Sequence, residues 1–145
     1  MTTQPKTVAQ QEPLVYPSIL PGTTIGGEVG IFNAPLTVYS PDMDRSRSLV
    51  GLVDTGALHT VIPAAMLEDL DIPVYGNRQY QLADGSAIAM PVGSAQIELE
   101  GEIFAVPVLF GTDRRNILIG ATTLETFGWA ADVKNRRFIP ADLTL

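Results

Sequence analysis

The chain contains no cysteine and a single histidine, His59. Without cysteine it forms no disulfide bond, no zinc site with thiolate ligands and no thiol nucleophile. One histidine cannot supply the several imidazole ligands of a multi-histidine metal site within one chain. We therefore expect neither a metal ion nor another cofactor.

Basic residues are also scarce, since 9 Lys and Arg stand against 16 Asp and Glu and the net charge is −7. Binding to nucleic acid or to an anionic membrane needs clustered basic side chains, so neither partner is expected. No apolar run approaches the length of a membrane span, and the N-terminus lacks the basic start and apolar stretch of a secretory signal. The expected location is the cytoplasm.

The composition is that of a folded domain with a polar N-terminal arm. A chain of 145 residues fits one domain, and a hydrophobic fraction of 46% is enough for a substantial core. Residues 1–24 are polar, rich in Gln and interrupted by four prolines. We interpret 1–24 as a flexible or loosely docked arm and 25–145 as the folded domain.

Short alternating runs separated by turn residues predict a mostly β fold. A strand end and a short turn of helix are expected at 60–73, and an apolar strand that runs into a helix at 116–128. Thr122 or Thr123 is expected to cap that helix and Gly128 to end it. A closed barrel and a sandwich both fit this pattern, with one short C-terminal helix. The other predicted strands lie at 27–39, 49–56 and 103–111. Residues 79–101 are expected to form a hairpin that turns at 83–86 and continues as a long alternating strand.

The most apolar predicted strand, LVGLVDTG at 49–56, ends on a carboxylate, a hydroxyl and a glycine. A buried carboxylate is costly unless it is paired or used, so Asp54 is a candidate catalytic residue. Thr55 offers a hydroxyl that can fix the loop, and Gly56 allows a sharp turn and the close approach of another chain. Asp-Thr-Gly is also an ordinary turn sequence, so the tripeptide alone does not establish a site.

The surroundings of Asp54 extend the pattern. LVDTGALHTVIP, the glycine-bearing stretch LADGS about thirty residues later, and NILIGATTLETFG resemble, in this order, the retropepsin-like aspartic proteases. The ending FGWAADVKNRRFIP is similar to the bacterial soluble members of that family. The resemblance covers residues 27–142 and implies the closed, barrel-like retropepsin fold.

The resemblance also implies the chemistry. In aspartic proteases, two facing carboxylates share one proton and activate a water molecule that attacks the peptide bond. Because the chain has one Asp-[Ser/Thr]-Gly, the expected enzyme is a homodimeric aspartic endopeptidase with a polypeptide substrate. Asp54, Thr55 and Gly56 are then the catalytic residues. Ala57, Leu58 and His59 would contact the substrate, together with a flap at Ala83, Asp84, Gly85 and Ser86.

Two departures from the retroviral pattern bear on this expectation. Leu58 and His59 stand where retroviral members carry two acids, and Ala121 replaces the Arg that follows the late glycine. A non-catalytic dimer that binds peptides on the same fold is the alternative from a different class. An unrelated β-barrel with an accidental Asp-Thr-Gly is a third reading, and it predicts a monomer without a cleft at Asp54.

Overall fold

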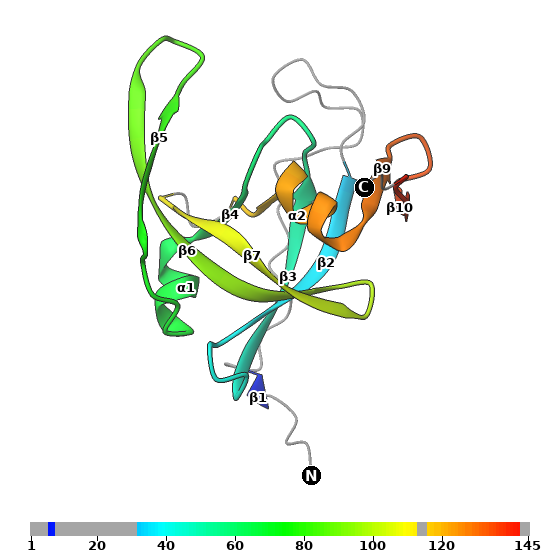
Figure 1. Ribbon diagram of the computed structural model, residues 1–145, viewed down its shortest axis with the longest axis horizontal. Coiled ribbons are helices and arrows are strands. Elements are labelled where there is room, and N and C mark those ends of the chain that lie inside the picture. Colours follow the sequence, from blue (N-terminus) through cyan, green and yellow to red (C-terminus); the bar gives the residue numbers. More distant parts are fainter. Residues whose placement is uncertain (1–5, 8–31, 113–115, 143–145) are drawn as a thin grey trace.

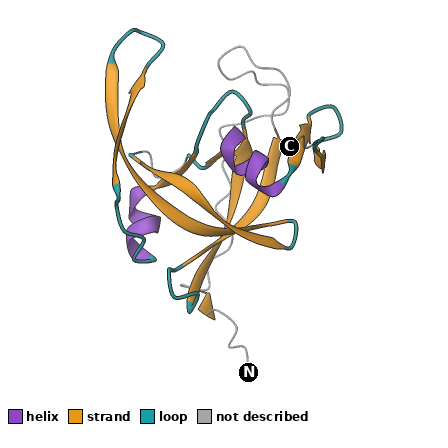
Figure 2. Ribbon diagram, viewed as in Figure 1, coloured by secondary structure: helices purple, strands orange, loops and turns teal. Residues whose placement is uncertain are grey.

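The computed structural model describes residues 6–7, 32–112 and 116–142, which form a mostly β structure with two short helices (Figures 1 and 2). The helices are α1 (Ala64–Asp69) and α2 (Ala121–Phe127). The strands are β1 (Lys6–Thr7), β2 (Phe32–Tyr39), β3 (Arg45–Val53), β4 (Thr60–Pro63), β5 (Gly76–Gln81), β6 (Ala87–Leu99), β7 (Glu102–Gly111), β8 (Leu118–Ile119), β9 (Trp129–Asp132) and β10 (Arg137–Pro140).

Six of these strands pair in a closed ring. The order of pairing is β3, β2, β6, β7, β4 and β8, and β8 pairs again with β3. The two residues of β8 therefore close the barrel, because Leu118 and Ile119 lie parallel to Leu52 and Val53 at the end of β3. Of the two architectures that the sequence left open, the barrel is the one observed.

Four strands of the described chain lie outside this ring. β5 pairs only with β6, and the resulting hairpin projects from the barrel (Figure 2). β9 and β10 form a separate antiparallel hairpin. β1 pairs in parallel with the start of β3, so two residues of the predicted arm contact the sheet. The rest of the arm lies outside the described residues, and the division at residue 24 stays a prediction.

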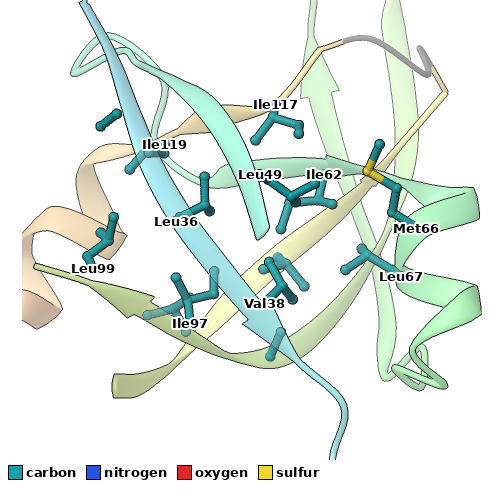
Figure 3. Close-up of a cluster of buried hydrophobic side chains, with 14 of the residues drawn as sticks. Leu36, Val38, Leu49, Ile62, Met66, Leu67, Ile97, Leu99, Ile117 and Ile119 are labelled. Atoms are coloured by element: carbon teal, nitrogen blue, oxygen red, sulfur yellow. The ribbon is translucent and has the colours of Figure 1, made fainter. Parts of the chain in front are cut away.

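The barrel interior is filled by alternate residues of its strands (Figure 3). In β2, Phe32, Ala34, Leu36 and Val38 are buried, whereas Asn33 and Pro35 between them are exposed. Successive side chains of a strand point to opposite faces, so this alternation of period two places one face of the strand in the core. The core side chains labelled in Figure 3 are Leu36, Val38, Leu49, Ile62, Met66, Leu67, Ile97, Leu99, Ile117 and Ile119.

The helices agree with the sequence in position and differ in one detail of capping. α1 is the turn of helix expected at 60–73, and its buried residues Met66 and Leu67 cover the core. α2 ends before Gly128, as predicted, and this glycine has a left-handed conformation with φ of 73°. The N-cap of α2 is Gly120, with no side-chain cap, so the predicted capping by Thr122 or Thr123 is wrong.

No helix in the described ranges is long and apolar enough to cross a membrane. The cytoplasmic location stays a prediction.

Candidate active site

Asp54 lies at the point where β3 leaves the barrel. Its backbone N–H donates to the carbonyl oxygen of Ile119 in β8 (3.1 Å), which is the last bond that holds this end of the strand. The chain then turns, because the N–H of Gly56 donates to Oδ1 of Asp54 (3.0 Å) and the N–H of Ala57 donates to its carbonyl oxygen (3.1 Å). These bonds fix the half-buried carboxylate at a barrel end, beside the exposed Thr55 and Gly56.

The loop that follows Asp54 closes the N-terminus of α2. The carbonyl oxygens of Ala57 and Leu58 accept hydrogen bonds from the N–H groups of Ala121 (2.8 Å) and Thr122 (2.9 Å). The first N–H groups of a helix have no partner inside the helix, so the loop supplies the acceptors that a capping side chain would otherwise provide. The Asp54 loop, defined as residues 54–59, is therefore braced directly by α2.

Gly120 allows this close fit. A Cβ atom at position 120 would lie 2.5 Å from the carbonyl carbon of His59 and 2.6 Å from its oxygen. A side chain of any size would force the two backbone segments apart, so glycine is required here by close approach.

Two buried threonines connect the end of the loop to α2. Oγ1 of Thr60 and Oγ1 of Thr123 lie 2.5 Å apart, and the N–H of Gly120 donates to the same Thr60 oxygen (3.1 Å). Both side chains are almost fully buried. The hydroxyl of Thr123 thus contacts Thr60 at the start of β4 rather than capping its own helix, which explains the wrong capping prediction.

His59 faces α2 and the β5–β6 hairpin. Its Nδ1 lies 3.2 Å from Oγ1 of Thr122, and its ring contacts the ring of Tyr80 edge to face, with centroids 6.4 Å apart and planes at 87°. Burial lowers the pKa of His59 below its ordinary value of 6.5, and the positive charge of Arg78 lowers it further. The neutral imidazole is therefore favoured in this arrangement.

The predicted flap is the turn of the β5–β6 hairpin. Leu82 and Ser86 close it through a backbone bond (2.7 Å), and Gly85 has a positive φ of 87° that suits glycine. The hydroxyl and N–H of Ser86 both donate to Oδ1 of Asp84, and these bonds lower the pKa of Asp84. Residues Ala83, Asp84, Gly85 and Ser86 are all exposed, as a mobile cover would require.

The structure joins the predicted site residues into two groups. Asp54 through His59 form one continuous loop on α2, and the hairpin turn forms a second group that projects from the barrel (Figure 1). The ring contact between His59 and Tyr80 links these groups, although no sequence pattern singled out Tyr80. In the described part of the chain, no three carboxylate, thiolate or imidazole groups gather closely enough to hold a metal ion.

Comparison with known proteins identifies a family. A family model described as "Aspartyl protease" matches residues 42–123, which is more than half of the chain and includes the Asp54 loop, the hairpin and the start of α2. No curated protein sequence matches significantly.

Several solved viral structures are similar to this chain. A foamy viral protease–reverse transcriptase in complex with an RNA/DNA hybrid is 19% identical, with a TM-score of 0.51 over 79% of this chain. The match spans only 13% of that viral chain. The Simian Foamy Virus (mac) protease is 19% identical, with a TM-score of 0.48 over 66% of this chain and 93% of the viral one. EIAV protease with the inhibitor HBY-793 is 20% identical, with a TM-score of 0.48 over 85% and 100% of the two chains.

At such identities the likeness to the foamy viral enzyme shows the fold alone, whereas the family model covers the residues around Asp54 directly. An accidental Asp-Thr-Gly on an unrelated barrel is therefore ruled out. The match over 42–123, on a closed barrel that holds Asp54 at the end of β3, shows that the chain belongs to the retropepsin-like aspartic proteases and is an aspartic-type peptidase.

Proposed function

We propose that the protein is a homodimeric aspartic endopeptidase whose catalytic pair consists of Asp54 from each of two copies. The observation that carries the proposal is the half-buried Asp54 carboxylate, which the Gly56 N–H fixes at a barrel end. The chain has only one Asp-[Ser/Thr]-Gly. One copy therefore provides one of the two carboxylates that the reaction needs, and a two-fold axis beside Asp54 would provide the second.

The chemistry follows from placing two carboxylates side by side. Like charges about 3 Å apart cannot both ionise, so the pair would hold one proton between them. The ionised carboxylate would accept a proton from water as the water attacks the carbonyl carbon of the scissile bond, and the protonated one would donate to the carbonyl oxygen. The apparent pKa values of such a pair belong to both residues together.

The substrate would lie extended between the Asp54 loop and the β5–β6 hairpin. Leu58 on the loop and Leu82 at the start of the hairpin turn expose 59% and 46% of their surface. Apolar substrate side chains would bury this surface, while main-chain hydrogen bonds would hold the peptide along the hairpin. We therefore expect a preference for apolar residues near the cleaved bond.

The test is cleavage of an unstructured protein such as casein between pH 4 and 7 by wild type and Asp54→Asn, with dimerisation checked by sedimentation. Wild type should cleave and the variant should not. Asp132→Asn is the matched control, because Asp132 is an aspartate in the β9–β10 hairpin that binds Asn135 and Arg137. Activity of the control should stay close to that of wild type.

A mixing experiment distinguishes a shared site from one within each copy. Equal amounts of wild type and Asp54→Asn, mixed at constant total concentration and allowed to exchange, would give about a quarter of the all-wild-type rate if each site needs both carboxylates. Independent sites would give about half. A rate near half, or undiminished cleavage by Asp54→Asn alone, would contradict the shared pair.

A further inference from the structure

Tyr80 is the residue of β5 that packs inward. The other five residues of this strand are exposed, and β5 pairs with no strand but β6 among the described residues. The hairpin therefore has few contacts by which the barrel can fix its direction. Tyr80 is also unusual in that its hydroxyl oxygen is buried and has no hydrogen-bond partner within the described part of the chain.

The ring of Tyr80 meets the ring of His59, which is itself held firmly. The centroid distance of 6.4 Å and the angle of 87° are those of an edge-to-face contact. On its other side, Nδ1 of His59 lies 3.2 Å from Oγ1 of Thr122 in α2, and the backbone of His59 lies against Gly120. The contact thus connects the hairpin to the same loop that carries Asp54.

We propose that Tyr80 is a positioning residue whose ring, packed on His59, sets the direction of the β5–β6 hairpin relative to the Asp54 loop. The inference rests on the proposed function, in which this hairpin covers the substrate. Tyr80 does not touch the reacting atoms. It acts through His59 and the hairpin, and it determines how readily the hairpin reaches its closed position over Asp54.

The ring, not the hydroxyl, provides the contact. A buried hydroxyl without a partner opposes the arrangement, because it gives up hydrogen bonds to water. Burial also raises the pKa of Tyr80, so the hydroxyl stays protonated throughout the working range of an aspartic protease. Tyr80→Phe should therefore keep the position of the hairpin, and Tyr80→Ala should lose it.

Hydrogen exchange followed by mass spectrometry tests the contact without any need for catalysis. In Tyr80→Ala, amides of β5 and of residues 87–92 in β6 should exchange about 3- to 10-fold faster, while β2 and β3 stay unchanged. Tyr80→Phe should exchange as wild type does. Tyr75→Ala is the matched control, because Tyr75 precedes the same strand and exposes 74% of its surface.

Kinetics then connects the contact to substrate binding. Loss of hairpin positioning should raise KM for a peptide substrate about 3- to 10-fold and leave kcat within about twofold, because the carboxylate pair is untouched. Tyr80→Phe should restore the wild-type KM. If the protein cleaved nothing at all, the proposed function would fail and the exchange result would still stand.

Three results would overturn the inference. These are unchanged hairpin exchange in Tyr80→Ala, faster hairpin exchange in Tyr75→Ala by the same factor, and equally fast hairpin exchange in Tyr80→Phe.

If Tyr80→Ala accelerated exchange throughout the barrel, His59→Ala would probe the contact from its other side. In His59→Ala the hairpin amides should exchange faster by the same factor as in Tyr80→Ala. The variant that carries both substitutions should exchange little faster than either single variant. If the two substitutions together multiplied their separate effects on the exchange rate, a direct contact would be contradicted.

Discussion

At the scale of single residues, the site depends on how closely two backbone segments approach. Gly120 lies against the backbone of His59, and the hydroxyl of Thr60 accepts the N–H of the same glycine. Neither residue would touch a substrate, yet both hold the loop that carries Asp54. Changes at these positions should therefore affect stability and activity together.

Gly120→Ala should destabilise the fold and displace the Asp54 loop. Its Cβ would lie 2.5 Å from a backbone carbon of His59, and relief of such overpacking costs about 1–3 kcal/mol. Urea unfolding monitored by the fluorescence of Trp129 would measure the change. Gly76→Ala is the control, since a Cβ there meets nothing within 4 Å, and equal stability of the two variants would contradict the close-approach argument.

Thr60→Val should cost more stability than Thr123→Val, although the two side chains contact each other. Thr60→Val leaves both the Gly120 N–H and the Thr123 hydroxyl without a partner, whereas Thr123→Val leaves the Thr60 hydroxyl still bonded to Gly120. Each buried group left unpaired costs about 1–3 kcal/mol, so the difference should be about 1 kcal/mol or more. Thermal unfolding of both variants would measure it, and the reverse order would contradict the assignment.

At the scale of elements, the β5–β6 turn is held by a carboxylate that must stay ionised. The Ser86 hydroxyl and N–H both donate to Asp84, and together they lower its pKa from the ordinary 3.8. Because the folded value is depressed, the turn is fully stabilised above 3.8 and loses these bonds as the pH falls through the lowered pKa. The hairpin turn should thus be intact over most of the acidic range in which a shared carboxylate pair works.

Ser86→Ala should raise the pKa of Asp84 toward 3.8, since the hydroxyl is the largest contributor to its shift. Titration of the side-chain carboxyl groups by NMR would follow this change directly. Asp42 provides an internal control, because the hydroxyl of Ser40 lowers its pKa in a similar way far from the hairpin. An unchanged Asp84, or an equal movement of Asp42, would contradict the local origin of the shift.

Elements whose signals are local were predictable from the sequence. Strand alternation in β2, the Asp-Gly turn at Asp84 and the end of α2 at Gly128 depend on residues close together in the chain. The N-terminus of α2 was not predictable, because the carbonyl groups that accept its first N–H groups, those of Ala57 and Leu58, lie more than sixty residues earlier. Asp54 was singled out because a carboxylate after an apolar strand stands out, and its catalytic role stays a prediction.

Tyr80 was missed because its partner, His59, is brought to it only by the tertiary fold. No spacing along the chain marks the pair. The predicted contacts of Ala57 and Leu58 with substrate stay predictions.

At the scale of the whole molecule, charge opposes the association that the proposed function requires. Each copy carries a net charge of −7, so two copies repel one another in solution. Contacts around the shared site would have to overcome this repulsion. An enzyme whose site is shared between copies is also sensitive to its own concentration.

Salt should therefore strengthen the dimer. The Debye length falls from about 30 Å at 0.01 M to about 8 Å at 0.15 M salt, which screens most of the repulsion between the copies. Sedimentation at several protein concentrations should give a dimer Kd several-fold lower at the higher salt. Specific activity at low protein concentration should rise in parallel, and a dimer that weakened with salt would point instead to an interface held by opposite charges.

The closure of the barrel by β8 has a consequence for the order in which the protein becomes functional during synthesis. The ribosome releases Asp54 and its loop early, but their supports, Ile119, Gly120 and the first turn of α2, follow more than sixty residues later. Until those residues emerge, the backbone of the Asp54 loop lacks the bonds that hold it against β8 and α2. The growing chain therefore cannot brace the Asp54 loop until α2 has been made.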